Sequence, residues 1–153
     1  MKELEIKNSK LKALVDDEDF ERLSKFNWFV AGSSIGRNND SHRGRHKNKR
    51  ISLASEIMNK PNLMFDHKDR DGFNNRKSNL RVCNYTQNNV NRAKRKGTSS
   101  IYKGVSLNKK SNRWDVFIRI SGKSTRVGET YTEECAGKVY DFYAKKQFGE
   151  FAY

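Results

Sequence analysis

The sequence predicts an α+β fold built from two small modules. Short runs of alternating apolar and polar residues, typical of half-buried strands, are separated by stretches with apolar residues at helical spacing. Apolar residues make up 34% of the 153 residues and charged residues 33%, which supports small cores and a shallow, open site rather than one deep pocket. A run of cations at 92–96, followed by Gly97 and small polar residues, is typical of a helix end and a linker. We therefore place a domain boundary there and predict modules over residues 1–97 and 98–153.

The first part of the chain is expected to form an α/β extension. Acidic residues at 16–19 are suited to cap the start of a helix that runs through Phe20, Leu23 and Phe26, between two flanking strands. These apolar positions define the buried side of the predicted helix.

A cationic stretch over residues 32–50 has the Gly and Asn punctuation of a long loop or hairpin tip. Such a stretch is either a solvated loop or a DNA-contacting one, and its His42 and His46 are interpreted as loop residues rather than metal ligands. Residues 51–59 have apolar residues at near-helical spacing and stop before Pro61, so a short helix is predicted to end there.

The central segment has the order strand, loop, strand, helix. Residues 62–65 are interpreted as a strand leading into Asp66 and His67. A turn-rich stretch follows, then a second strand at 80–83 and a helix over about 86–96. This order places a carboxylate and an imidazole side by side on the first strand.

Four residues of this segment carry groups that phosphodiester chemistry uses: Asp66, His67, Asn79 and Asn88. Hard divalent cations prefer oxygen ligands such as carboxylates and amide carbonyls, and a neutral histidine takes a proton from water. Neighbours on a strand point to opposite faces, so Asp66 and His67 reach one metal and one water only where the backbone bends. Taken singly, each is more often an ordinary surface or turn residue.

Three segments resemble the signature of phage-type HNH homing endonucleases: 65–69 (FDHKD), 74–82 (NNRKSNLRV) and 86–91 (TQNNVN). The resemblance implies a ββα-metal HNH core over about 62–96 that holds one cation against the scissile phosphate. It implies that His67 is the general base, that Asp66 and Asn88 bind the metal, and that Asn79 holds the loop and the histidine strand in register. An all-oxygen ligand set favours Mg²⁺, with Mn²⁺ as the alternative.

Net charge predicts the partner. Lys and Arg number 32 against 18 Asp and Glu, a formal charge of +14, and so basic a chain attracts polyanions, nucleic acid first among them, through counterion release. The resemblance implies that this nucleic acid is double-stranded DNA. Neither a membrane partner nor a protein partner is expected, and a monomer is expected on DNA. Charged residues stand where a signal peptide needs an apolar stretch, and Cys83 and Cys135 form no C-x-x-C pair, so a reducing compartment is expected. Together with the resemblance, this predicts a phage-encoded protein of the bacterial cytoplasm.

The second module is predicted to be a three-stranded antiparallel sheet packed on one helix. Strands are expected at 101–107, at 113–120 and around 126–128, and a final helix is capped by Thr132 and ended by Gly149. In the middle strand, alternate residues face the helix: Trp114, Val116, Ile118 and Ile120. The intervening residues face the opposite side: Arg113, Asp115, Phe117 and Arg119.

This module resembles the Apetala/ERF type of DNA-binding domain through five segments: 102–105 (YKGV), 113–114 (RW), 118–119 (IR), Gly128 and 134–141 (ECAGKVYD). The resemblance implies that the sheet lies in the major groove. Together with cations of the first module, the expected DNA-binding residues are Arg81, Arg92, Arg95, Lys103, Gly104, Lys109, Lys110, Arg113, Phe117, Arg119, Lys123 and Arg126. Ser106, Asn108 and Ser124 stand where plant members have arginines, so several guanine-reading contacts are missing.

The function that these features predict is metal-dependent hydrolysis of a DNA phosphodiester bond by an HNH endonuclease of homing type, with nicking or cleavage as its outcome. The alternative is a DNA-binding regulator that carries an inactive HNH domain.

Overall fold

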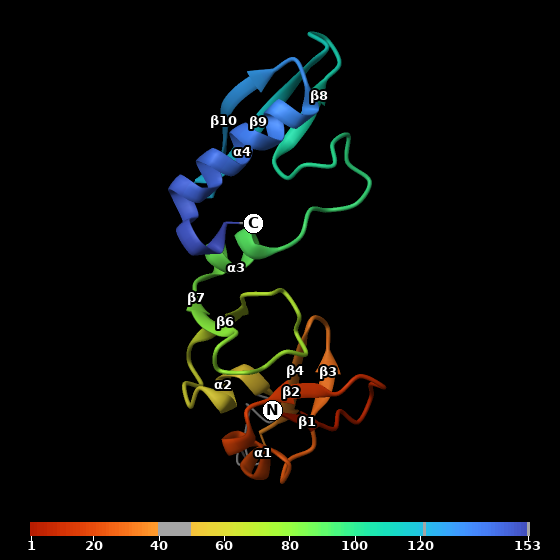
Figure 1. Ribbon diagram of the computed structural model, residues 1–153, viewed down its shortest axis with the longest axis vertical. Coiled ribbons are helices and arrows are strands. Elements are labelled where there is room, and N and C mark those ends of the chain that lie inside the picture. The colour runs from red at the N-terminus through yellow and green to blue at the C-terminus, as the bar shows by residue number, and fades with distance from the viewer. Residues whose placement is uncertain (40–49, 121, 153) are drawn as a thin grey trace, which may run out of the picture. The chain divides into compact units, whose positions relative to one another are not determined.

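A computed structural model describes residues 1–39, 50–120 and 122–152 (Figure 1). The chain divides into two compact units, Met1–Asn84 and Tyr85–Tyr153. The fold is mixed α+β, with small antiparallel sheets and four α-helices in the described residues. None of the helices in that part of the chain has the length and apolar character needed to span a bilayer.

The first unit contains three antiparallel sheets. In chain order its elements are β1 (Lys2–Leu4), β2 (Ala13–Val15), α1 (Asp17–Leu23), β3 (Phe29–Ala31), β4 (Ser34–Asn38), β5 (Arg50–Ser52), α2 (Leu53–Ile57), β6 (Met64–His67) and β7 (Leu80–Cys83). β1 pairs with β2, β4 lies between β3 and β5, and β6 pairs with β7.

One apolar cluster holds this unit together. Val15, Leu23, Trp28 and Leu53 are almost completely buried in it, and Leu80 connects it to the β6–β7 hairpin. The Trp28 indole donates a hydrogen bond of 2.8 Å to the Leu23 carbonyl, which satisfies its buried N–H.

The loop between β6 and β7 is fastened to the N-terminal part of the unit. Leu14 of β2 donates from its backbone N–H to the Phe73 carbonyl at 2.7 Å and accepts from the Asn75 N–H at 2.8 Å. The Lys77 N–H donates to the Asp16 carboxylate at 2.8 Å. These bonds give a long loop the fixed backbone of a sheet edge.

The predicted helix between two strands is confirmed as α1, but two details of the prediction are wrong. The helix ends at Leu23 rather than at Phe26, whose ring packs edge-on against Trp28 with centroids 6.2 Å apart. Asp16 stands at the N-cap position without a side-chain capping bond, because its carboxylate accepts the Lys77 N–H instead.

The cationic stretch over 32–50 is not a loop throughout, because it begins with β4 and ends in β5. Arg37 forms an ion pair with Glu56 at 3.0 Å, and Arg50 donates to the carbonyls of Ala31 and Ser34. His42 and His46 lie outside the described residues. The following helix, α2, is shorter than predicted because Ile51 belongs to β5, and Asn59 with a φ of 51° comes shortly after it.

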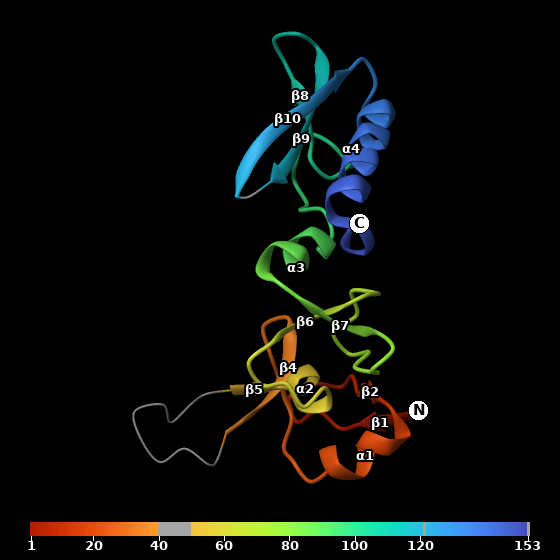
Figure 2. The same ribbon diagram turned by 90° about the vertical axis from the view of Figure 1, so that its left-hand side faces the viewer.

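The second unit is a three-stranded antiparallel sheet covered on one face by a helix. It comprises α3 (Tyr85–Asn91), β8 (Val105–Asn108), β9 (Arg113–Ile120), β10 (Lys123–Thr130), α4 (Glu133–Phe148) and the short 3-10 helix η1 (Gly149–Phe151). β9 is the central strand, and α4 runs along the sheet (Figure 2). The predicted three strands and final helix are confirmed, but β8 begins at Val105 rather than at Ile101, and β10 extends on both sides of the predicted 126–128.

The core of this unit follows the alternation predicted for β9. Val116 and Ile118 are buried with Ala136, Tyr140 and Ala144 of α4, while Trp114 and Ile120 pack at the edge of the cluster. The Thr132 hydroxyl accepts from the Cys135 N–H at 3.3 Å, so the predicted cap is confirmed. β10 carries one bulge, since its pairing with β9 shifts between Arg126 and Gly128.

The helix predicted over 86–96 is shorter in the structure, where α3 ends at Asn91. The residues beyond it include Arg92, Lys94, Arg95 and Lys96, whose like charges would repel across one helical turn. The Lys103 ammonium donates to the carbonyls of Val90 and Arg92, and so satisfies backbone acceptors at the helix end. Moreover, α3 belongs to the second unit, whereas the sequence places the module boundary after it.

Candidate active site

Asp66 and His67 are the last two residues of β6, and β7 pairs with both. Asp66 lies opposite Arg81 and His67 opposite Leu80, in regular antiparallel register. The side chains therefore start from opposite faces of the hairpin. The chain turns directly after His67, because the Arg70 N–H donates to the His67 carbonyl at 3.0 Å and Arg70 adopts a φ of 67°.

Asp66 is a buried carboxylate held by an arginine. The Arg81 Nε and Nη2 lie 3.0 and 2.8 Å from the Asp66 Oδ2, and the two side chains are only 10% and 6% exposed. A buried carboxylate is costly unless it is paired, and the cross-strand arginine supplies the partner. Arg81, predicted to bind DNA phosphate, thus lies on the carboxylate that was predicted to bind the metal.

His67 is oriented by an asparagine of the loop. Its Nε2 lies 3.1 Å from the Asn75 Oδ1, and the Asn75 amide nitrogen donates to the Gly72 carbonyl at 2.9 Å. Asn75 is 2% exposed, so its amide is fixed by the fold. Because an amide oxygen only accepts, the His67 Nε2 must carry a proton, and in a neutral imidazole Nδ1 is then the basic nitrogen.

Asn79 lies at the centre of the loop's hydrogen-bond network. Its amide nitrogen donates to the Asp69 Oδ1 at 2.9 Å and to the Asn74 carbonyl at 2.7 Å, and its Oδ1 accepts from the Asp69 N–H at 3.1 Å. The Asn79 backbone carbonyl also accepts from the Lys68 N–H. The residues directly after His67 are thereby tied to the residues directly before β7.

Asp69 and Asn75 are residues of this site that the sequence analysis did not single out. Asp69 accepts from the Asp71 N–H at 2.8 Å and from the Asn74 amide at 2.6 Å, besides Asn79. Burial by itself raises the pKa of Asp69, but these hydrogen bonds and the nearby His67 hold it below its ordinary value. The spacing of Asp, Gly and Asn over 69–75 is a signal for turns in which side chains hydrogen-bond the backbone.

The other metal ligand predicted from the sequence, Asn88, lies in α3 of the second unit and is partly exposed. Among the residues that the structure describes, no group of three or more His, Cys, Asp or Glu is arranged to hold a metal ion. Burial, with a smaller contribution from Asp66, raises the pKa of the Cys83 thiol to about 11, so this thiol stays protonated at neutral pH.

Several residues predicted to bind DNA have structural partners in the second unit. Gly104 has a φ of 68°, and the Tyr140 ring and the Phe117 carbonyl occupy the space of a β-carbon. Lys103 caps α3. Arg113 and Arg126 form ion pairs with Glu129, and Arg126 also pairs with Asp115.

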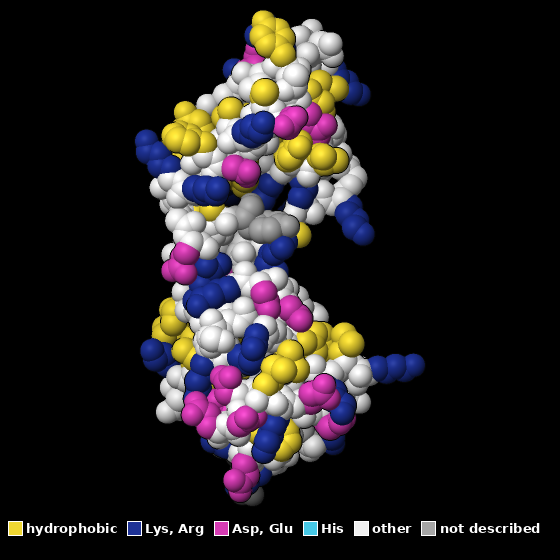
Figure 3. All heavy atoms as spheres, viewed as in Figure 1, with side chains coloured by type: hydrophobic (Ala, Val, Ile, Leu, Met, Phe, Trp, Pro, Cys, Tyr) yellow, Lys and Arg dark blue, Asp and Glu magenta, His cyan; other side chains and the backbone are white. Residues whose placement is uncertain are grey.

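Other predicted DNA-binding residues are exposed, namely Arg92, Arg95, Lys109, Lys110, Arg119 and Lys123, whereas Phe117 is half-buried. Lys and Arg side chains are spread over the face shown in Figure 3, with acidic side chains between them. Cations outnumber acidic residues in each of the two units. Each unit therefore has a charge that favours a polyanion.

Comparison with known proteins found one curated relative at a significant level. The chain is 29% identical over 140 residues to a protein of Acanthamoeba polyphaga mimivirus named "Uncharacterized HNH endonuclease L560". The alignment covers 92% of this chain and 72% of the mimivirus protein. No family model matches the chain, and no solved structure matches it significantly.

Proposed function

We propose that this protein is an HNH-type endonuclease that hydrolyses DNA phosphodiester bonds with the help of a divalent metal ion. The observation that carries the proposal is the adjacent pair on β6, in which Arg81 holds Asp66 and Asn75 orients His67. The similarity to a mimivirus protein named as an HNH endonuclease supports the same class of activity. The net charge of +14 supports DNA as the substrate.

His67 is the general base of the proposed reaction. Its Nε2 donates to Asn75, so Nδ1 takes the proton from the attacking water. The water oxygen forms a bond to phosphorus, the bond to the departing 3′ oxygen breaks, and that oxygen takes a proton from solvent water, which leaves a 5′-phosphate and a 3′-hydroxyl. The Asn79 network supports this role, because it fixes the loop that carries Asn75.

Asp66 is the proposed carboxylate ligand of the metal ion, and Asn88 supplies the amide oxygen. Both donors are oxygens and therefore suit Mg²⁺, with Mn²⁺ as the alternative. A divalent cation held there supplies charge neutralisation at the phosphate and at the departing oxygen. Because Arg81 already neutralises the Asp66 carboxylate, a cation has to compete with this arginine.

The helix α3 is the proposed third element of the ββα core, which spans about 62–96. The following residues, 98–153, are the proposed Apetala/ERF-type module, which positions the nuclease on double-stranded DNA. The sheet and covering helix of the second unit support this assignment.

A DNA-binding regulator without nuclease activity is the second candidate. The Arg81–Asp66 pair favours it, since the arginine places a permanent positive charge where the nuclease requires a metal ion. The two candidates differ in one measurable property, metal-dependent strand cleavage.

Plasmid nicking separates the two candidates. The protein is incubated with supercoiled plasmid DNA in Mg²⁺, in Mn²⁺ or in chelator, together with the His67→Ala variant. We expect metal-dependent conversion to open-circular DNA by the wild type and loss of it in the variant, with DNA affinity nearly unchanged, because the base acts in the transition state. A protein that binds the plasmid but never nicks it in either metal is the regulator.

Asp66 needs a control of its own. Asp66→Leu leaves Arg81 buried without its partner, and breaking such a pair costs roughly 3–5 kcal/mol. The double variant Asp66→Leu/Arg81→Met replaces the pair by apolar side chains and is expected to regain most of that stability. A double variant that folds but does not cut assigns the loss of activity to the carboxylate rather than to unfolding.

A further inference from the structure

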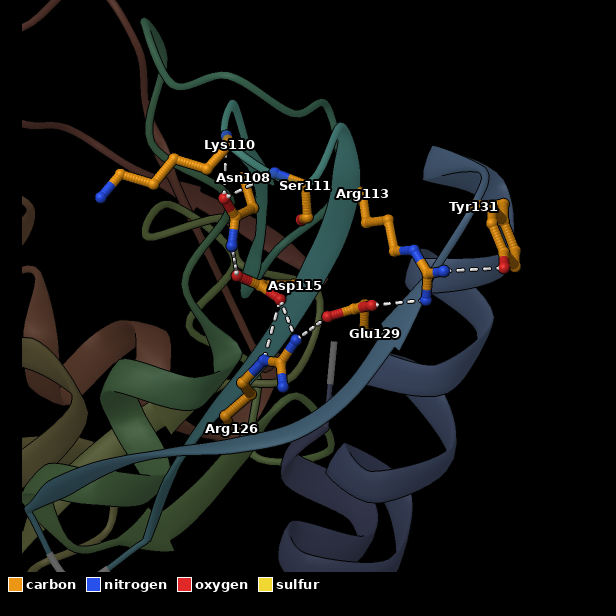
Figure 4. A network of polar contacts seen from close by, with 8 residues as sticks. All are labelled: Asn108, Lys110, Ser111, Arg113, Asp115, Arg126, Glu129 and Tyr131. Carbon is orange, nitrogen blue, oxygen red and sulfur yellow. Dashed lines mark hydrogen bonds and ion pairs between the residues drawn. The ribbon is translucent and has the colours of Figure 1, made fainter.

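The face of the β8–β9–β10 sheet that points away from α4 carries a continuous polar network (Figure 4). Asp115 and Glu129 are direct partners across β9 and β10, and Arg126 is the partner of Phe117. Since Val116 and Ile118 face α4, their neighbours in the strand face the opposite side. The network therefore lies on the face that the proposed function directs toward DNA.

Arg126 is shared between the two acids of this face. Its Nε and Nη2 lie 2.8 and 2.5 Å from the Asp115 Oδ1, and its Nη2 also donates to the Glu129 carboxylate. The hydrogen bonds from Arg126, first to Asp115 and then to Glu129, raise the pKa of its guanidinium. The guanidinium of Arg126 thus donates its hydrogen bonds to carboxylates of the protein itself.

Glu129 also holds the second arginine. The Arg113 Nη1 lies 2.7 Å from the Glu129 Oε1, and its Nη2 donates to the Tyr131 hydroxyl at 2.8 Å. The same guanidinium lies 4.3 Å from the centre of the Tyr131 ring. One glutamate therefore joins two arginines that come from two strands.

The fold positions the acids more firmly than the arginines. Asp115 is buried, and its second carboxylate oxygen accepts from the Asn108 amide at 3.2 Å. The Asn108 Oδ1 in turn accepts from the backbone of Lys110 in the β8–β9 turn. The side chains of Arg113 and Arg126 are 39% and 47% exposed, so they are free to turn toward solvent.

We propose that Asp115 and Glu129 are specificity-determining residues, which keep Arg113 and Arg126 in intramolecular ion pairs that the phosphates of arbitrary DNA do not displace. This inference rests on the proposed function, because it assumes that the face meets DNA. A DNA phosphate has to replace a carboxylate that already binds the arginine. The exchange therefore adds little free energy of binding. A target that also offers base edges in the groove supplies the additional interactions that release the arginines.

An arginine can exchange a carboxylate for a DNA phosphate because exposed ion pairs are weak. The pairs that Glu129 makes with Arg113 and Arg126 join partly exposed side chains and stabilise the protein little, so Glu129 holds the arginines without fixing them permanently. Each arginine that turns from carboxylate to phosphate releases one further counterion from DNA. The acids thus reduce the number of phosphates that the face neutralises on non-target DNA.

The test compares Glu129→Gln with Glu134→Gln, by titration of a fluorescent mixed-sequence duplex at several salt concentrations. Both variants lose one negative charge, but Glu129 pairs with Arg113 and Arg126, whereas Glu134 pairs with Lys138 on the exposed side of α4. In Glu129→Gln we expect affinity to rise roughly three- to tenfold at about 0.1 M salt, with a log–log salt slope steeper by about one. In Glu134→Gln we expect much smaller changes.

A second substitution shows whether the gain passes through the held arginine. Arg113→Gln should remove most of the gain when combined with Glu129→Gln, because Arg113 loses its carboxylate partner in that variant while Arg126 keeps Asp115. Asp115→Asn repeats the test at the buried acid, and the half-exposed Glu129 keeps the test valid if that variant does not fold.

Two results overturn the inference and can be distinguished from each other. If the wild type binds and nicks DNA but Glu129→Gln behaves as Glu134→Gln does, only the role of the acids fails. If neither protein binds the duplex at any salt concentration, the inference fails together with the proposed DNA substrate.

Discussion

Gly104 illustrates how a residue of a predicted binding motif can be required by packing instead. Its φ of 68° lies in the left-handed region, and the Tyr140 ring fills the space beside it. The Phe117 N–H donates to the Gly104 carbonyl at 2.7 Å, which connects the segment before β8 to the central strand. Packing in the core of the second unit therefore requires glycine at position 104.

Gly104→Ala is expected to destabilise the second unit strongly. A left-handed alanine costs about 1–2 kcal/mol, and overlap with Tyr140 adds about 1–3 kcal/mol. Gly97→Ala is the matched control, because Gly97 has a φ of 76° and nothing within 4 Å of an added β-carbon. Urea unfolding measures both. Equal losses in the two variants would show that only the backbone conformation matters at Gly104.

The positions of site residues were predictable where they depend on neighbours in the sequence. The adjacency of Asp66 and His67 is visible in the sequence, whereas their partners are not. Arg81 is fifteen positions from Asp66, and their contact depends on the cross-strand register. Asn75 reaches His67 only because the loop folds back between β6 and β7.

The loop between β6 and β7 is stabilised by hydrogen bonds to one ionised side chain, Asp69. Three donors converge on the Asp69 carboxylate: the Asp71 N–H and the amides of Asn74 and Asn79. The pKa of Asp69 is lowered in the folded protein despite the opposing effect of burial. Its ionised form therefore stabilises the loop at neutral pH.

Asp69→Asn is expected to make the first unit less stable at neutral pH and less sensitive to acid. The stabilisation from a lowered pKa is complete above the unfolded value of about 3.9 and is lost as the pH falls through the folded value. The difference between wild type and variant should therefore shrink below about pH 4. Urea midpoints measured across this range test it, with Glu21→Gln on the exposed side of α1 as control. A constant difference would contradict the ionised role of Asp69.

Elements with strong local patterns were predicted best. The bounds of β7 and β9 match the prediction, because alternation and turns define both ends. The prediction for α3 was too long, since its helical pattern continues into cations whose repulsion opposes helix. The capping of that helix by Lys103 is a contact between elements and leaves no pattern in the sequence.

At the scale of the whole molecule, the chain has two separate apolar clusters. One is centred on Trp28 and Leu53 in the first unit, and the other on Val116 and Tyr140 in the second. Composition alone predicted small cores. The cationic residues at 92–96 predicted a module boundary after residue 97, whereas the contacts divide the chain after Asn84. The unit boundary after Asn84 depends on where α3 packs, which the sequence does not encode locally.

Two clusters of this size predict two unfolding transitions. Each unit contains one of the two tryptophans, so in the Trp114→Phe variant fluorescence reports the first unit through the buried Trp28. We expect this signal and the circular dichroism of the whole chain to follow different urea curves. Adding Gly104→Ala should shift the circular-dichroism transition of the second unit and leave the Trp28 fluorescence transition of the first unit unchanged. Coincident curves would mean that the two units unfold together.

The backbone bonds between Leu14 and the loop at Phe73 and Asn75 determine the smallest segment that could be transplanted with the candidate site intact. A graft of residues 62–96 alone would carry the three segments that resemble the HNH signature but would lose the strand to which the loop is fastened. Asn75 would then no longer be held where it orients His67. The smallest segment able to keep the site in order therefore begins upstream of Leu14, so the N-terminal extension belongs to the structural unit of the candidate site.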